Sequence, residues 1–110
     1  MSHYVHPDRV MLGKCTRKEI RQALASGALK AALLPIGAIE QHNEHLSLDV
    51  DIVMATFMCQ QIALELYPQA TVAPSSPVGY SPYHMARKGT LTVRNEPLKA
   101  FLSAFVASLK

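Results

Sequence analysis

Apolar and polar residues alternate along the chain in blocks that predict helices and short strands. The block "TRKEIRQALASG" begins with Thr16 followed three residues later by Glu19, the spacing of a capping box, and ends with Gly27, which can supply a left-handed stop. These signals predict a helix over residues 17–26. The next block, "AALLPIGAIE", is a short continuous apolar run, which is typical of a strand buried on both faces of a parallel sheet, although Pro35 argues against a long one.

Three further elements follow the same reasoning. The segment "DIVMATFMCQQIALELYP" has helical spacing of apolar residues from Ile52 to Leu66 and ends at Pro68. The segment "ATVAPSSPVGY" predicts a brief strand and then a long exposed loop. A last helix should begin with Asn95 as its cap. Its apolar stripe comprises Leu98, Phe101, Leu102, Phe105, Val106 and Leu109.

The order helix, strand, helix, strand, helix predicts an α/β fold: a layered fold with a mostly parallel sheet and flanking helices. Residues 1–110 contain neither an internal repeat nor a Gly/Ser-rich linker, so they form one domain or part of one. Two strands are too few for a sheet covered on both faces, and the stripe of the last helix needs a partner. We therefore expect the fold to be incomplete in this chain.

Composition narrows the class of protein. With 49% hydrophobic and 17% charged residues the chain resembles soluble globular domains, and its apolar runs are too short to cross a membrane. The N-terminus has no apolar signal region, and Cys15 and Cys59 are expected to be unpaired thiols, which indicates the cytoplasm. The net charge of +3 is spread too thinly for a nucleic-acid surface.

Side chains that can bind a metal ion or transfer a proton are concentrated in "IEQHNEHLSLDVD", residues 39–51. This segment holds six of the thirteen Asp, Glu and His residues of the chain: Glu40, His42, Glu44, His45, Asp49 and Asp51. It follows an expected strand, where sites of open α/β sheets lie. In an extended backbone residues 40 and 42 point the same way, and Asp51 could join them from the next helix. Imidazole and carboxylate ligands suit zinc, manganese or a related divalent ion.

Several known patterns fit these residues poorly. His42 and His45 are three residues apart, whereas zincins need two histidines four apart. The pair His42 and Glu44 lacks the P-C-x-x-C partner of zinc deaminases, and G-x-S-x-G is absent, although another serine or cysteine nucleophile stays possible. A simpler alternative is that Asp49 and Asp51 only cap a helix.

Two blocks carry a resemblance to a known family. The stretch "LLPIGAIEQHNEHLSLDVD" resembles the start of the creatininase (creatinine amidohydrolase) family, with its Pro-x-Gly-x-x-Glu-Gln-His pattern followed by a histidine and an aspartate. The stretch "GYSPYHMARKGTLTV" resembles the second block of that family. The resemblance implies that residues 1–110 are the N-terminal portion of a single metallohydrolase domain that cleaves non-peptide C–N (amide) bonds in a small cyclic or linear compound.

The resemblance also implies roles for individual residues. Glu40 would bind one divalent ion, His42 the other, and Asp51 would bridge them, with zinc or manganese as the metals. His45 would orient a ligand or shield the site, and Ser81 and His84 would lie on the substrate side. No catalytic residue is expected within the chain. The expected partners are a small-molecule amide, the missing C-terminal half of the domain and further copies in a homo-oligomer, with neither nucleic acid nor membrane.

The sequence also departs from the family pattern. Asn43 and Glu44 stand where many members have Gly-Pro, and Ser47 stands where many have proline. The remaining ligands of the family belong to an Asn-Gly-His type segment that residues 1–110 do not contain, so we expect this chain alone to be inactive. The alternative is a non-catalytic half domain that acts as an interaction or self-associating module.

Overall fold

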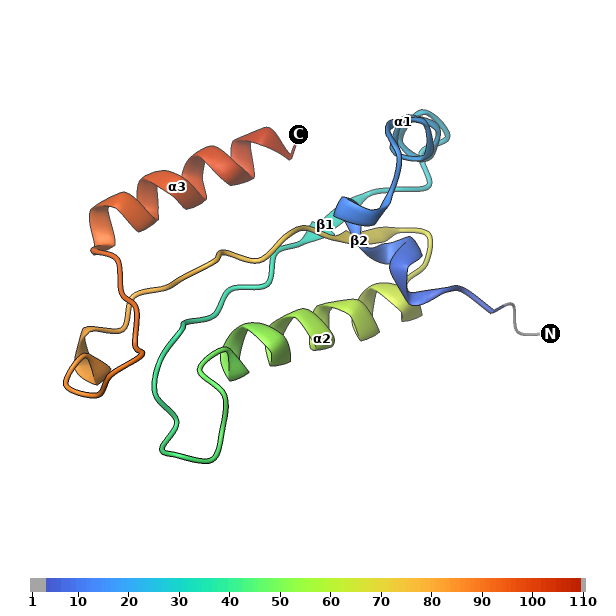
Figure 1. The fold of residues 1–110 in the computed structure, drawn as a ribbon. Coiled ribbons are helices and arrows are strands. Elements are labelled where there is room, and N and C mark those ends of the chain that lie inside the picture. Colours follow the sequence, from blue (N-terminus) through green and yellow to red (C-terminus); the bar gives the residue numbers. More distant parts are fainter. Residues whose placement is uncertain (1–3, 110) are drawn as a thin grey trace. The chain divides into compact units, whose positions relative to one another are not determined.

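The computed structural model describes residues 4–109 and contains three α-helices and two strands in the predicted order. Along the chain these are α1 (Arg17–Ala25), β1 (Ala31–Leu33), α2 (Val50–Glu65), β2 (Ala70–Val72) and α3 (Asn95–Ser108) (Figure 1). β1 and β2 pair in parallel, with Ala31 opposite Ala70 and Leu33 opposite Val72. The predicted mixed α/β fold with a parallel sheet is therefore confirmed.

The chain divides into two compact units. The first comprises residues up to 35 together with residues 56–75, and the second comprises residues 36–55 together with residues 76 onward. Each unit is thus assembled from two separate stretches of chain, and α2 contributes to both.

The core of the first unit is small. Four buried residues form it: Val10, Ala63, Ala70 and Val72. Partly buried side chains surround it, namely Met11, Leu33, Cys59 and Leu64. Cys59 thus packs against the core, and both cysteines are free thiols, as predicted.

α1 begins and ends where its sequence signals predict. The side chain of Thr16 accepts a hydrogen bond from the backbone N–H of Glu19, and the Glu19 carboxylate accepts one from the backbone N–H of Thr16. Gly27 follows the helix with a φ of 76°, a left-handed conformation that glycine adopts without steric cost. Both expected termini are confirmed.

The expected burial of β1 on both faces is wrong. Ala31 and Ala32 are exposed and Leu33 is half-buried. The reason is that β1 is an edge strand of the two-stranded sheet formed by residues 4–109, whereas β2, whose three residues are buried, also pairs through Val72 with Met11. β1 also ends before the buried Pro35, consistent with the inability of proline to donate to a ladder.

Asn95 is not the cap of α3, contrary to expectation. It is the first helical residue, and Arg94 occupies the cap position without a side-chain hydrogen bond. A capping side chain at position 95 would need a free N–H two or three residues later. Pro97 has none, and the N–H of Leu98 already donates to the carbonyl of Arg94.

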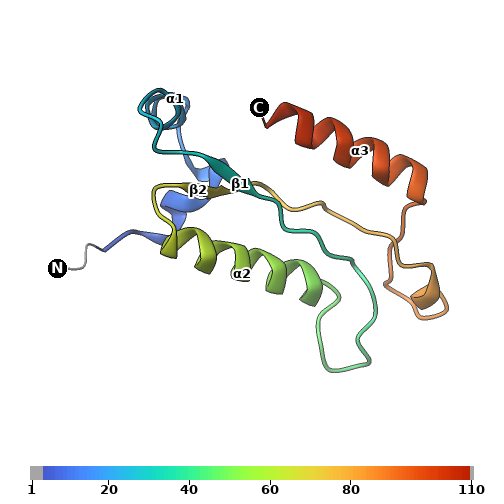
Figure 2. The same ribbon diagram turned by 180° about the vertical axis from the view of Figure 1, so that it is seen from behind.

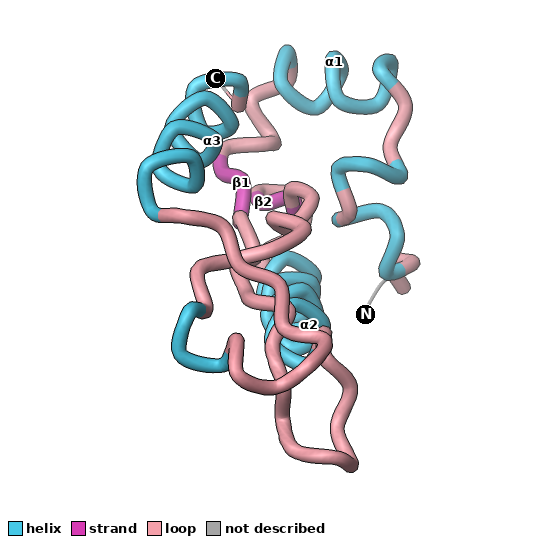
Figure 3. Tube along the Cα trace, turned by 60° about the vertical axis from the view of Figure 1, so that its left-hand side comes forward, coloured by secondary structure: helices cyan, strands magenta, loops and turns pink. Residues whose placement is uncertain are grey.

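The second unit is rich in loops. Long segments with neither α-helix nor β-strand lead from β1 into α2 and from β2 into α3, and the second contains a short 3-10 helix, Pro82–His84 (Figures 2 and 3). The second of these was expected to be exposed, but Ser76, Gly79 and Ser81 are buried. Gly79 explains this burial, because a Cβ built there would lie only 2.6 Å from the carbonyl oxygen of Gly37. Among residues 4–109, no helix has the length and apolar character that a bilayer crossing requires.

Candidate functional site

The Glu40–His42 segment is held in the second unit by a stretch about 50 residues further along the chain. The N–H of Leu91 donates to the carbonyl of Ile39 at 2.9 Å, and the N–H of Gln41 donates to the hydroxyl of Thr90 at 3.0 Å. The N–H of Glu40 donates to the carbonyl of Leu48. Hydrogen bonds on both sides therefore hold the backbone from which the Glu-Gln-His side chains project.

Gly37 brings the first turn of α2 against this segment. A Cβ at position 37 would lie 2.7 Å from the backbone nitrogen of Ile52 and 2.8 Å from the carbonyl carbon of Asp51. Only glycine permits such an approach of two backbones. The approach places Asp51 beside His42.

His42 and Asp51 form the first of two pairs. Nε2 of His42 lies 3.6 Å from Oδ1 of Asp51, which is too long for a hydrogen bond. This nitrogen is buried and has no hydrogen-bond partner among the residues that the structure describes. A buried polar atom without a partner costs about 1–3 kcal/mol, so its presence requires an explanation. An imidazole nitrogen and a carboxylate oxygen held this close together are a suitable donor pair for a divalent ion.

Glu40 and His84 form the second pair. Nε2 of His84 lies 2.9 Å from Oε2 of Glu40, whose side chain is only 16% exposed. Nδ1 of the same ring lies 2.9 Å from Nε2 of Gln41. The imidazole of His84 therefore contacts the side chains of two consecutive residues, one at each ring nitrogen.

The structure brings the expected metal ligands together in pairs rather than as a triad. Among residues 4–109, no three His, Cys, Asp or Glu side chains converge as a metal-binding group. Glu40 faces His84, whereas His42 faces Asp51. The assignment of Glu40, His42 and Asp51 as ligands stays a prediction.

The other candidate residues are placed differently. His45 is exposed, and no hydrogen bond or ion pair of the described residues involves it. Ser81 is 3% exposed, and its backbone N–H donates to the hydroxyl of Thr92 at 2.8 Å. The substrate-side role of Ser81 and the orienting role of His45 both stay predictions.

Asp49 and Asp51 differ in environment, which bears on whether they act only as helix caps. Asp49 directly precedes α2, and its carboxylate accepts a hydrogen bond from the Ser47 hydroxyl at 2.8 Å. Asp51 lies inside the first turn and faces His42. A purely local role is therefore adequate for Asp49, but it does not account for the position of Asp51.

Sequence reasoning missed two residues of this site. The sequence gives no role to Gln41, which lies within the Glu-Gln-His pattern, or to Thr90, which lies within the second block. Alternation along an extended backbone would direct Gln41 away from its two neighbours. The positive φ of 62° at Asn43 shows that the backbone is not extended throughout this loop. The side-chain oxygen of Gln41 accepts a hydrogen bond from the N–H of Asn43, which fixes its amide.

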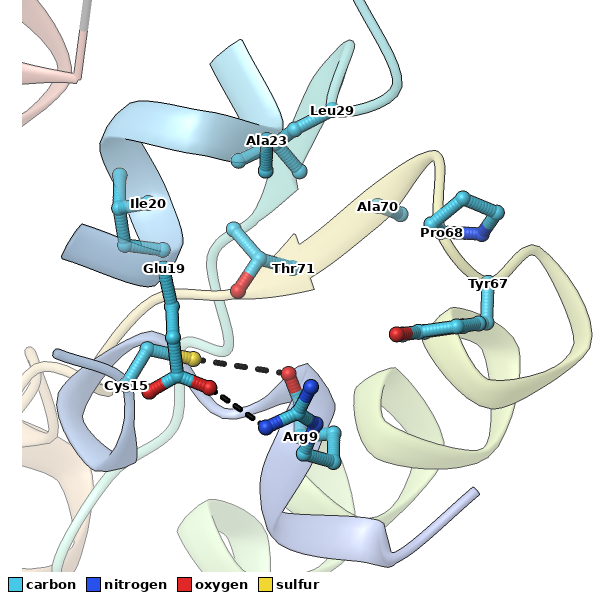
Figure 4. Close-up of a pocket in the computed structure, with 10 residues that line it drawn as sticks. All are labelled: Arg9, Cys15, Glu19, Ile20, Ala23, Leu29, Tyr67, Pro68, Ala70 and Thr71. Atoms are coloured by element: carbon cyan, nitrogen blue, oxygen red, sulfur yellow. Dashed lines mark hydrogen bonds and ion pairs between the residues drawn. The ribbon is translucent and has the colours of Figure 1, made fainter. Parts of the chain in front are cut away.

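A hollow of about 100 Å³ in the first unit is lined by none of the residues of the two pairs described above (Figure 4). It contains the Arg9–Glu19 ion pair and the thiol of Cys15, which donates to the carbonyls of Arg9 and Met11. Burial raises the pKa of Cys15, with a smaller contribution from the Glu19 carboxylate. A thiol of this kind is a weak nucleophile. The candidate site therefore lies in the second unit.

Residues of both units match a known protein family. Residues 13–110 match the family model for creatininase, described as creatinine amidohydrolase. A creatinine amidohydrolase of Pseudomonas putida is 35% identical over 71 residues, which are 64% of this chain and 26% of that protein. A 3-dehydro-scyllo-inosose hydrolase of Thermotoga maritima is 31% identical over 102 residues, which are 92% of this chain and 32% of that protein. The chain thus spans about a quarter to a third of the length of these relatives.

Solved structures give the same result. A creatininase described as its Mn form has a TM-score of 0.81 and 28% sequence identity. A glutamate-to-glutamine mutant of creatininase, described as the Zn-Zn type, has the same TM-score and identity. Both alignments cover 91% of this chain and 40% of the other.

Proposed function

This chain belongs to the creatininase family, and we propose on that basis that the whole protein is a metal-dependent amidohydrolase. Its reaction would be hydrolysis of a non-peptide C–N (amide) bond in a small cyclic or linear compound. The single observation that carries the proposal is the buried Nε2 of His42, which has no partner among the described residues and lies 3.6 Å from the Asp51 carboxylate. This nitrogen is well suited to a metal ion.

The proposed ligands divide between two divalent ions. Glu40 would hold one ion, His42 the other, and Asp51 would bridge them. The imidazole and carboxylate donor set fits zinc or manganese, and two creatininases of similar structure are described as Mn and Zn-Zn forms. When bound, such ions supply a hydroxide at neutral pH and polarise the amide carbonyl.

The residues of this chain would contribute position and charge to that reaction. His42 directly follows residues whose backbone is hydrogen-bonded on both sides, so the backbone that carries its imidazole is held in place. The partly exposed Asp51 would present its carboxylate from the first turn of α2. The proton-transfer group would come from the part of the protein outside residues 1–110.

Elemental analysis of the purified whole protein tests the metal assignment. Asp51→Ala should remove most of the bound metal, because it removes the bridging carboxylate. Asp49→Ala is the matched control, since it removes a carboxylate two residues away that is exposed and bound to Ser47. Unchanged metal content in Asp51→Ala would refute the assignment. Residues 1–110 alone should turn over no amide, and measurable turnover would contradict the proposed division of the site.

A second candidate function is an interaction or self-associating module. The supporting observation is that α3 has no buried residue, with Phe101 45% exposed and Val106 54% exposed. Large apolar groups exposed along one helix favour association. We propose that the remainder of the family domain covers this face in the whole protein, which would be a cytoplasmic homo-oligomer. Sedimentation of residues 1–110 tests whether the exposed face of α3 drives association. A compact monomer at micromolar concentration would mean that this face does not have to be buried against another chain or segment.

A further inference from the structure

We propose that His84 is a positioning residue that holds Glu40 in its metal-binding orientation, and that Gln41 fixes the tautomer of His84 for this role. The inference rests on the proposed function, because it takes Glu40 as a metal ligand. It assigns His84 a task different from contact with the substrate, and it gives Gln41 a role in the site.

One group beside the Gln41 side chain has a fixed hydrogen-bonding role. The backbone N–H of Asn43 can only donate, and it lies 3.0 Å from Oε1 of Gln41. The oxygen of the Gln41 amide must therefore face Asn43, which leaves the NH₂ group to face His84. An amide NH₂ only donates, so Nδ1 of His84, at 2.9 Å, must accept.

The tautomer of His84 follows directly. A neutral imidazole carries one proton, and if Nδ1 accepts, that proton is on Nε2. Nε2 lies 2.9 Å from Oε2 of Glu40, so the ring presents an N–H to the carboxylate. A proton on Nδ1 would set two donors against each other at the Gln41 contact. Gln41 thus determines which ring nitrogen faces Glu40.

The geometry explains why Glu40 needs such support. A glutamate side chain has several rotatable bonds and loses considerable conformational entropy when it is fixed. His84 contacts one carboxylate oxygen, Oε2, and thereby restricts the orientation of the whole group. Groups that orient metal ligands typically change metal affinity about 10–100-fold when they are removed. The short helix that ends at His84, Pro82–His84, would therefore support the site from a position far along the chain.

The first test measures zinc and manganese affinity of the whole protein by competition with a chelator. His84→Ala should weaken binding by about 10–100-fold, and Gln41→Glu should weaken it in the same direction, because a carboxylate cannot donate to Nδ1. Gln61→Glu, the same change at an exposed position on α2, is the control and should keep the affinity of the unchanged protein.

The second test reads the tautomer without reference to metal or activity. ¹⁵N chemical shifts of the His84 ring in the metal-free protein, assigned through the backbone resonances of His84, should show the proton on Nε2. In Gln41→Glu the Nδ1 nitrogen should become protonated. Gln41→Glu keeps the imidazole of His84, so its tautomer can be measured even if His84→Ala does not fold.

The outcomes separate the two proposals. If Glu40→Ala abolishes metal binding while His84→Ala and Gln41→Glu bind as the unchanged protein does, the positioning role is overturned and the proposed function stands. If Glu40→Ala leaves metal binding unchanged, both the ligand assignment and the positioning role are overturned. A ring proton found on Nδ1 in the unchanged protein would overturn the role of Gln41 by itself.

Discussion

Gly37 gives the sharpest test of how the site is built. Replacing it with alanine adds a Cβ that would lie 2.7 Å from the backbone nitrogen of Ile52, about 0.7 Å closer than the 3.4 Å at which ordinary contact begins. The groups on both sides are backbone, so the strain cannot be relieved by rotating a side chain. The first turn of α2 must move away from the segment that carries His42.

The magnitude follows from that enforced shift. Inserting one methyl group into a closely packed position typically costs about 1–3 kcal/mol. In the whole protein, whose domain is longer than residues 1–110, each kcal/mol should lower the melting temperature by no more than about 2–4 °C. Because the turn that moves carries Asp51, the 3.6 Å separation between Asp51 and His42 should also increase, and metal affinity should fall.

Thermal unfolding followed by circular dichroism measures this cost. Gly13→Ala is the matched control, because a Cβ at position 13 meets no atom within 4 Å and the residue does not require a positive φ. There the change should be within about 1 kcal/mol and in the stabilising direction, since alanine restricts the unfolded chain. Equal midpoints for Gly37→Ala and Gly13→Ala would refute the packing argument.

Three further predictions concern single residues. Asn43 has a left-handed φ of 62°, so Asn43→Ala should lower the free energy of unfolding by about 1–2 kcal/mol while Asn43→Gly should not, and equal values from urea titrations would contradict this. The pKa of Glu19 is lowered, chiefly by the hydrogen bond from the backbone N–H of Thr16. Its stabilising contribution is therefore complete above the ordinary value of 4.5 and is lost as the pH falls through the lowered pKa. Acid titration of α1 helicity should show this loss, and Glu19→Gln, which keeps the capping box but cannot ionise, should lack it. Burial raises the pKa of both Cys15 and Cys59, so iodoacetamide should modify them more slowly at pH 7 than it modifies a free thiol, and rates equal to that of free cysteine would be inconsistent with their positions.

The helices were more predictable from sequence than their surroundings. The capping box of α1 is local, since Thr16 and Glu19 are three residues apart and need no other part of the chain. The start of α3 was misplaced because capping depends on which N–H groups are free. Pro97 and the bond from Leu98 to Arg94 remove the two that Asn95 would need.

The site was predictable in its residue types but not in its pairing. The concentration of carboxylates and imidazoles between residues 39 and 51 marked the segment that contributes to both observed pairs. The contact of Glu40 with His84 was not predictable, because it depends on the path of the loop between β2 and α3. Burial of that loop depends in turn on the close approach of Gly79 to Gly37, which no local pattern indicates.

The long separation in sequence between the partners of Gln41 has a consequence for synthesis of the protein. Its side chain contacts a residue 43 positions later, and its backbone N–H binds one 49 positions later. A nascent chain therefore exposes the Glu-Gln-His segment for some time before either partner has been translated. The entropy of closing the intervening loop must be offset when they meet, but each doubling of its length adds only about 0.6 kcal/mol. Any shortened product that stops before His84 would thus keep the motif while lacking both contacts that give it a geometry.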